Sequence, residues 1–408
     1  MASALDQPLN RTGRITQLVR VLALHARCPR FESVCAHMKL IKNVFITALV
    51  IVSVLLMSCQ GKNTTAQPAS SGKGVTVLLL TDSSGVDDKS FNAAAWKGIL
   101  DFYSASGNEY GWLATENQSM YVPSLRQATD EGHDLIIVNG FTWDEALTQV
   151  SNDNPRQKYL IVDVDWVEAG NVMQAAYAEH EGSYLVGAAA ALKYLEDREA
   201  NPDFLMFPRF GFIGGMPGAV ITKFEVGYIQ GVLSIIPNAQ FVDYYVGSWS
   251  EPALAKIQAM NWYDSGVYAI FSAAGNSGNG TIAQAREYRA VGRNVWAIGV
   301  DSDQYEEGLY NSTDSAVLTS MLKRVENSVI FALNAVKNNT FNPSVITFDL
   351  KADGVGYSNA NAALGVNIIN KLENIKQQIS NGQITVAATL AEAVRLPGFP
   401  QNLRAIDD

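Results

Sequence analysis

The sequence predicts an α/β protein of two lobes, each a parallel sheet flanked by helices. Short apolar runs alternate with segments of helical periodicity, which is the pattern of βα units joined by right-handed crossovers. The pattern restarts near residue 210, so two similar halves follow each other along the chain. In both halves polar residues directly follow the apolar runs, where open parallel sheets bind their ligands.

The first half begins with the apolar run 75–80 (VTVLLL), which is long enough for a strand buried on both faces. Turn-forming residues follow, and Ser90 precedes a helical pattern over 91–102 as a candidate cap. Further strands are predicted at 135–138 and 159–163. A helix is predicted over 179–195, where small residues indicate close packing on a sheet.

The second half repeats this order. Strands are predicted at 210–213, 241–246, 269–272 and 295–300, with helices after residue 218 and over 251–261. The last of these strands ends at Asp301. Residues 318–336 then predict a helical return segment, and 345–350 a late strand.

Length, charge and cysteine content exclude several classes of protein. The chain has 408 residues, enough for two domains, and its formal net charge of -10 argues against a nucleic-acid surface. Cysteines occur only at 28, 35 and 59, so the folded body can form neither a disulfide framework nor a cysteine metal site. Four scattered histidines argue against a histidine metal site, and no cofactor is expected.

Residues 38–59 have the organisation of a bacterial lipoprotein signal peptide. Lys39 and Lys42 precede an apolar segment too short for a comfortable membrane span, and LMSC at 56–59 resembles a lipobox. Such a signal implies a lipid on Cys59. A single membrane anchor is the alternative, and either way the body lies outside the cytoplasm. Residues 60–74 read as a flexible tether, and 1–37 as an upstream extension that is not part of the native protein.

Candidate ligand-binding side chains gather after the predicted strands. A cleft with two aromatic faces suits a flat heterocycle, while carboxylates accept hydrogen bonds from hydroxyl or ring N–H groups and a lysine donates them. Asp87 and Asp88 are better explained as helix caps, and Phe91 is either a ligand contact or core. The candidate set consists of Asp82, Phe91, Asn92, Asp163, Asp165, Met216, Phe224, Phe271, Gly275, Asp301 and Lys323.

Enzymatic and dinucleotide-binding functions are disfavoured. The loop 275–280 (GNSGNG) follows a strand and precedes Asp301, but its glycines fall in the wrong order for a dinucleotide fingerprint. No G-x-S-x-G motif, H-E-x-x-H motif or cysteine nucleophile exists in the body. Glu179-His180-Glu181 lies at the start of a helix, where a structural cap is the simpler interpretation.

Several motifs, in order, resemble the basic membrane protein family. These are bacterial lipoproteins similar to purine nucleoside receptor A, the substrate-binding parts of ABC transporters. The resemblance covers roughly residues 75–350. It is carried by DDKSFN (87–92), EHEGSYLVG (179–187), FGFIGG (210–215) with Phe224 and Gly227-Tyr228, SAAGNSGNG (272–280), IGVDSD (298–303) and VLTSMLKRVENSV (317–329).

The resemblance implies a periplasmic-binding-protein type I fold with three crossovers. The N-terminal lobe would comprise 75–180 and 304–342, and the C-terminal lobe 181–303 and 343–408. Phe91 would stack on a purine base, with Phe271 or, less favoured, Phe224 on its other face. Asp82, Asn92 and either Asp163 or Asp165 would meet the base, and Asp301 and Lys323 the ribose.

The resemblance also implies a function. The protein would be a monomeric, lipid-anchored receptor that captures a purine nucleoside and delivers it to an ABC permease, without enzymatic activity. Two departures leave the ligand open: Asn276-Ser277 replaces the family's usual Gly-Thr, and VDVDW (162–166) offers two aspartates instead of one. The alternatives are a surface adhesin or antigen, and a binding protein of the same fold for another ligand such as riboflavin or a sugar.

Overall fold

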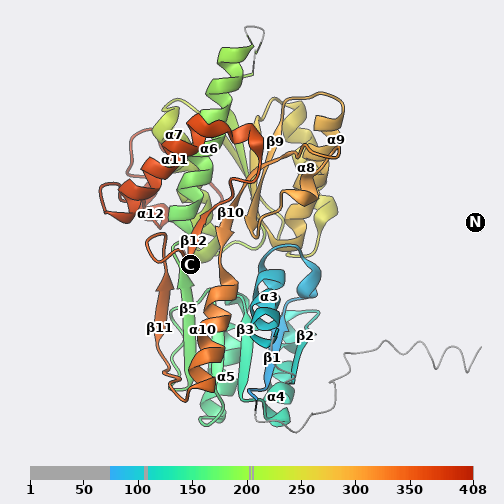
Figure 1. Cartoon of the computed structure of the whole chain (residues 1–408), viewed down its shortest axis with the longest axis vertical. Coiled ribbons are helices and arrows are strands. Elements are labelled where there is room, and N and C mark those ends of the chain that lie inside the picture. The colour runs from blue at the N-terminus through green and yellow to red at the C-terminus, as the bar shows by residue number, and fades with distance from the viewer. Residues whose placement is uncertain (1–73, 105–108, 202–203, 205, 408) are drawn as a thin grey trace, which may run out of the picture. The chain divides into compact units, whose positions relative to one another are not determined.

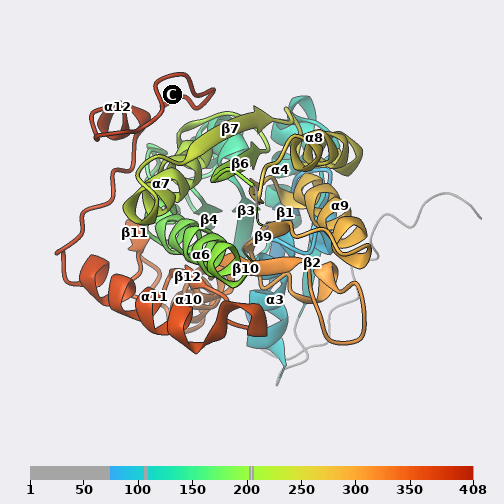
Figure 2. The same cartoon turned by 90° about the horizontal axis from the view of Figure 1, so that it is seen from above.

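The structure is a computed structural model that describes residues 74–104, 109–201, 204 and 206–407. Two six-stranded sheets organise this part of the chain (Figures 1 and 2). The predictions of an upstream extension, a signal peptide, the tether up to residue 73 and a lipid on Cys59 lie outside the described residues.

The first sheet has the strand order β11-β5-β4-β3-β1-β2, and all its strands are parallel. Strand order places β1 beside β3, so Leu78 lies opposite Ile136. The strands are β1 Val77–Thr81, β2 Tyr110–Ala114, β3 Leu135–Asn139, β4 Tyr159–Val162, β5 Val172–Tyr177 and β11 Val345–Phe348.

Both faces of the first sheet are covered, as its continuous apolar runs predict. On β1, Leu79 belongs to one core cluster and Leu80 to another, because successive side chains point to opposite faces. Helices α3 (Phe91–Tyr103) and α10 (Val325–Lys337) pack together on one face, and α4 (Tyr121–Glu131) packs with α5 (Asp144–Asp153) on the other.

The second sheet has the order β12-β10-β9-β8-β6-β7, with only β12 antiparallel. Its long helices α6 and α7 pack against each other, and α8 packs against α9. The strands are β6 Arg209–Gly214, β7 Gln240–Tyr245, β8 Ala269–Ala273, β9 Trp296–Asp301, β10 Val317–Lys323 and β12 Val355–Tyr357. The helices are α6 Glu179–Ala200, α7 Ala219–Ile235, α8 Pro252–Asp264, α9 Asn279–Ala290, α11 Gly365–Ser380 and α12 Leu390–Ala393.

The described chain passes between the sheets three times, after β5, after β10 and after β11. Two parts of the expected lobe boundaries were wrong. β10 lies within the segment 304–342 but pairs with β9 in the second sheet, and β11 lies beyond residue 343 but pairs with β5 in the first. The predicted helical return segment 318–336 is therefore a strand followed by α10, because pairing with β9 determines the conformation of its first part.

Glycines allow α6 and α7 to approach closely. A Cβ added at Gly231 would lie 2.0 Å from the carbonyl oxygen of Tyr184, and one at Gly187 would lie 2.2 Å from that of Tyr228. Since these neighbours are backbone atoms of the facing helix, no side chain can move aside to make room. The small residues predicted to indicate close packing in 179–195 thus pack chiefly against another helix.

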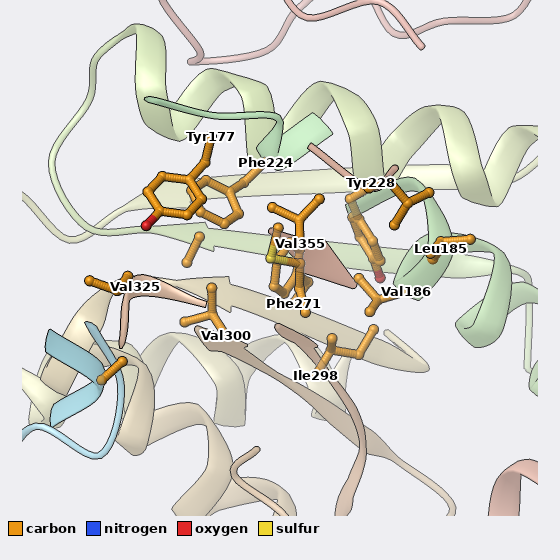
Figure 3. Packing of buried hydrophobic residues seen from close by; sticks show 14 of the residues in the cluster. Tyr177, Leu185, Val186, Phe224, Tyr228, Phe271, Ile298, Val300, Val325 and Val355 are labelled. Atoms are coloured by element: carbon orange, nitrogen blue, oxygen red, sulfur yellow. The ribbon is translucent and has the colours of Figure 1, made fainter. Parts of the chain in front are cut away.

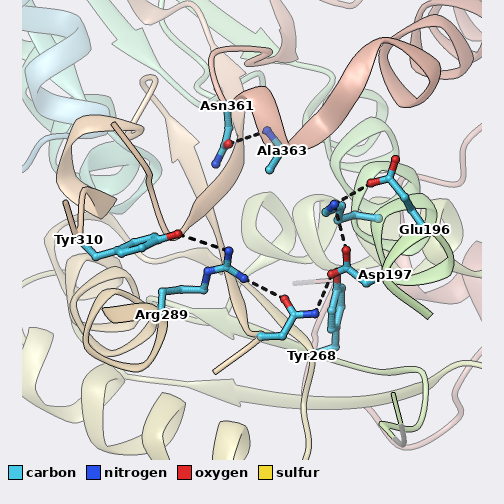
Figure 4. A network of polar contacts seen from close by, with 9 residues as sticks. Glu196, Asp197, Tyr268, Arg289, Tyr310, Asn361 and Ala363 are labelled. Atoms are coloured by element: carbon cyan, nitrogen blue, oxygen red, sulfur yellow. Dashed lines mark hydrogen bonds and ion pairs between the residues drawn. The ribbon is translucent and has the colours of Figure 1, made fainter. Parts of the chain in front are cut away.

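A polar network links α6 to the amino ends of β8 and β9 in the second lobe (Figure 4). The Asp197 carboxylate accepts hydrogen bonds from Tyr268 Oη at 2.7 Å and Asn294 Nδ2 at 2.8 Å, and pairs with Lys193. Arg289 donates to Asn294 Oδ1 at 2.8 Å. This network lies at the opposite strand ends from Asp301 and is structural.

Candidate functional site

A cavity lies where the carboxyl ends of strands from both sheets meet. Its empty space is about 530 Å³, counting the part that opens to solvent. Both lobes contribute to its wall. The lining residues are Asp82, Asp88, Phe91, Asn139, Gly140, Phe141, Thr142, Asp163, Ile221, Phe224, Trp249, Ala273, Gly275, Val300, Asp301 and Lys323.

The first lobe contributes side chains that follow β1, β3 and β4. Asp82 follows β1, and Phe91 is the first residue of α3. Asn92 is buried and does not line the cavity. Its Nδ2 donates to Asp82 Oδ1 at 3.3 Å, while its Oδ1 accepts from Asn139 Nδ2 at 2.8 Å. Asn92 therefore orients two lining residues, in place of the expected direct contact with ligand.

Asp88 both caps a helix and lines the cavity. Its carboxylate accepts hydrogen bonds from the backbone N–H groups of Ser90, Asn92 and Ala93 at 2.9–3.0 Å. Burial raises its pKa to about 6 in spite of these bonds. The helix cap predicted from the sequence is present. Asp88 also lines the cavity because α3 begins beside it, at Phe91.

The second lobe supplies an apolar wall and one carboxylate. Phe224 and Ile221 come from the first two turns of α7, and Trp249 comes from the loop after β7. Trp249 meets Phe141 of the first lobe edge-to-face, with ring centroids 6.0 Å apart. Aromatic side chains from both lobes thus border the same cavity.

Asp163 and Asp301 occupy matching positions, directly after or at the end of strands of the two sheets. Both have left-handed backbones, with φ of 72° and 64°. Non-glycine residues in this region are uncommon and cost of order 1–2 kcal/mol each, and such strain clusters at binding sites. Ser90 Oγ donates to Asp301 Oδ2 at 2.6 Å, and burial raises the pKa of Asp301 to about 7.

Lys323 ends β10 and is fully buried beside the cavity. Its Nζ lies 2.5 Å from Asp163 Oδ1 and 3.0 Å from Glu179 Oε1. Burial alone lowers the pKa of Lys323, but the surrounding carboxylates hold it above its ordinary value. The ring centroids of Phe91 and Phe224 lie 5.1 and 5.2 Å from the ammonium. The charged group therefore lies close to an aromatic ring of each lobe.

Glu179 completes this ion-pair cluster at the start of α6. Burial raises its pKa, but the charges of Lys323 and Lys223 outweigh burial and leave it below the ordinary value. Glu179 is 1% exposed and pairs with Lys323 instead of capping a helix with its side chain. The interpretation as a simple cap was wrong, because the partner lies 144 positions along the chain.

Three predicted site residues lie away from the cavity. Asp165 is exposed on the loop after β4, and Met216 is half-buried outside the lining. Phe271 is fully buried in the second-lobe core with Phe212, Phe224 and Tyr228 (Figure 3). It points from the middle of β8 toward α7, so it cannot offer a face to the cavity, and Phe224 takes that place.

The chemistry of this wall suits a neutral ligand with a planar ring and hydroxyl groups. The described lining residues include four carboxylates and one ammonium. Anionic ligands would meet repulsion there, whereas hydroxyl and ring N–H groups can donate to the carboxylates. The described residues contain no cluster of histidine, cysteine and acidic side chains that could hold a metal ion. In the same part of the chain, no helix is sufficiently long and apolar to cross a bilayer.

Comparison with known proteins identifies relatives along almost the whole described body. Residues 75–389 match the profile of a family described as "ABC transporter substrate-binding protein PnrA-like". The "ABC transporter nucleoside-binding protein BmpA" of Lactococcus lactis is 30% identical over 356 residues, covering 84% of this chain and 98% of that protein. The "CD4+ T-cell-stimulating antigen" of Listeria innocua is 34% identical over 328 residues, covering 78% and 89%.

A solved structure supports the architecture. A solute-binding protein of an ABC transporter system from Aeropyrum pernix K1 superimposes with a TM-score of 0.71 at 24% identity, covering 79% of this chain and 96% of that one. At this identity the likeness concerns the fold alone. It confirms the predicted two-lobed binding-protein fold, as the family match confirms the resemblance inferred from the motifs.

Proposed function

The chain belongs to the family of PnrA-like ABC transporter substrate-binding proteins, and on this premise we propose that it captures purine nucleosides for uptake. A protein of this family binds a small-molecule substrate for a membrane permease and is not an enzyme. The observation that carries the proposal is that Phe91, Asp301 and Lys323 line the same cavity.

In the proposed complex the purine lies against Phe91 and Phe224, and its edge faces Asp82 and Asp163. Stacking between a base and an aromatic side chain contributes roughly 1–3 kcal/mol. The ribose hydroxyls donate to Asp301 and accept from Lys323. The nucleoside-binding relative supports this class of ligand, and the excess of carboxylates favours neutral nucleosides over nucleotides.

The alternative of an adhesin or antigen with a vestigial cleft has less support. The Listeria innocua relative is named for stimulating T cells, which says nothing about a ligand. A vestigial cleft would not need a fully buried lysine between two buried carboxylates, because replacing such a cluster by apolar residues is often neutral or stabilising. Riboflavin or a sugar remains the competing ligand for the same fold.

Two experiments test the proposal. Mass spectrometry of the small molecule that copurifies with the protein should identify a purine nucleoside. Titration calorimetry should show inosine binding much more tightly than hypoxanthine, and Asp301→Ala should remove most of this preference, since the base lacks the hydroxyls. Equal affinities of the unmodified protein for inosine and hypoxanthine would rule out the ribose contacts.

We also propose that the protein is anchored outside the cytoplasm by a lipid on Cys59. The supporting observation is the lipobox-like LMSC at the end of an apolar segment. Metabolic labelling with palmitate should mark the unmodified chain and not Cys59→Ala. Labelling that persists in this variant would contradict the anchor.

A further inference from the structure

The segment Asp88–Ser90 of the first lobe is bound from outside the cavity by the second lobe. Its three consecutive carbonyl oxygens accept hydrogen bonds, in order, from Asn279 Nδ2 at 2.9 Å, Gln304 Nε2 at 3.1 Å and Ser302 Oγ at 3.1 Å. None of these three donors lines the cavity. We refer to Asn279, Ser302 and Gln304 as the clasp residues.

Two of the clasp residues are held in place by their own lobe. Gln304 is 2% exposed, and its Oε1 accepts from the backbone N–H of Val300 at 3.0 Å. Its backbone N–H donates to Ser320 Oγ at 3.0 Å, and its Nε2 also reaches Asn279 Oδ1 at 3.2 Å. Asn279 Nδ2 donates in addition to Asn276 Oδ1 at 3.0 Å. Because these contacts lie within the second lobe, the donors are oriented before the first lobe meets them.

The inner side of the same segment faces the ligand cavity. Asp88 and Phe91 line the cavity, and the Asp88 carboxylate fixes the backbone through three N–H groups. Lys89 has a left-handed backbone with φ of 60°. The turn therefore directs three carbonyls toward the second lobe while Asp88 and the adjoining Phe91 face the cavity, so contact on one side affects the geometry of the other.

We propose that the clasp residues are positioning residues that hold the lobes closed around the ligand and so determine how long it stays bound. This inference rests on the proposed function, since it concerns release from the same cavity. Losing one donor removes a hydrogen bond between lobes without removing a ligand contact. The ligand should then dissociate faster, whereas its association with the open cleft should change little.

Stopped-flow binding of inosine provides the first test. Asn279→Ala and Gln304→Ala should each raise the dissociation rate roughly 2- to 10-fold, the equivalent of one lost hydrogen bond, and the double variant should raise it more. Association rates should stay within about twofold. Asn261→Ala, which removes an exposed amide of α8, is the matched control and should change neither rate. Unchanged dissociation in the double variant would overturn the proposal.

Hydrogen–deuterium exchange of the full chain provides a test that does not depend on the ligand. Opening of the lobes should speed exchange in the cleft segments 139–143 and 217–221, which the clasp residues do not touch. A purely structural role of Gln304 would speed exchange near 300–305 alone, and that result would refute the clasp. If the unmodified protein bound no nucleoside, the proposed function would fail, while this exchange pattern would still decide the role of the clasp.

Discussion

Replacing Lys323 by methionine should destabilise the protein strongly, and the loss should depend on pH. Lys323 Nζ pairs with Asp163 at 2.5 Å and Glu179 at 3.0 Å, and all three side chains are at least nine-tenths buried. Removing one partner of a buried pair costs about 3–5 kcal/mol, because the remaining charge stays desolvated. Here Asp163 loses its ammonium partner, whereas Glu179 keeps Lys223 Nζ at 3.6 Å, so we expect a loss within this range at pH 7.

The pH dependence follows from the pKa of each carboxyl group. In the unmodified protein Lys323 keeps the pKa of Glu179 below its ordinary value, so this stabilisation is present above that value and is lost in acid. In the unmodified protein burial already raises the pKa of Asp163 to about 6; without Lys323 this pKa should rise further, and that of Glu179 should rise as well. Both acids then bind protons more tightly in the folded state, and stability falls as pH rises. The difference between the two proteins should therefore be small near pH 4 and grow toward pH 8.

Urea denaturation across this pH range measures the difference. Lys97→Met, which breaks an exposed pair with Asp101, is the control and should cost less than about 1 kcal/mol at every pH. Adding Asp163→Asn to Lys323→Met should recover stability at pH 7, because the stranded charge is removed. A loss for Lys323→Met that does not vary between pH 4 and 8 would refute this reasoning.

Three further changes test the site and the core. Phe91→Ala should weaken nucleoside binding by roughly 1–3 kcal/mol in calorimetry, and unchanged affinity would place this ring in the core. Burial raises the pKa of Glu225 from 4.5 to about 8. The folded state thus binds this proton more tightly than the unfolded state, so the free energy of unfolding falls as pH rises from about 4.5 to 8. Glu225→Gln should therefore add on the order of 3 kcal/mol at pH 7. The same pH dependence of stability in both proteins across this range would contradict this prediction. Gly231→Ala should cost at least about 1–3 kcal/mol in chemical denaturation, because its Cβ would meet the Tyr184 carbonyl, while Gly170→Ala has open space and should cost little.

The proposed function also bears on how the lobes move. Lys323 ends β10 at the second crossover, and Glu179 begins α6 at the first. Leu350, after β11 at the third crossover, donates its backbone N–H to Glu181 Oε2 at 2.8 Å. Charged side chains therefore link the three connections between the lobes. A hinge at these connections would therefore lie beside the ion pairs of Lys323.

Local patterns in the sequence determined the order of most elements and the position of the site. The apolar runs before Asp82, Asp163 and Asp301 are long enough for buried strands, and parallel strands bring their carboxyl ends to one edge. Those three carboxylates line the cavity for this reason. Lys323 was identified through the family motif at 317–329, although the segment 318–336 that contains it was predicted to be a helix.

Other features depended on contacts between residues far apart in the chain. The apolar segment 317–336 suits either a strand or a helix, and pairing of β10 with β9 decided the conformation of its first part. Phe271 and Phe224 are equivalent by composition and belong to the same core cluster, but Phe271 lies in the middle of β8, away from the carboxyl ends of the strands where the cavity lies. No local sequence pattern predicts that Trp249 lines the cavity. The same holds for the ion pair of Glu179 with Lys323. Sequence periodicity reports which face of an element is buried, whereas the tertiary structure decides which distant side chains meet there.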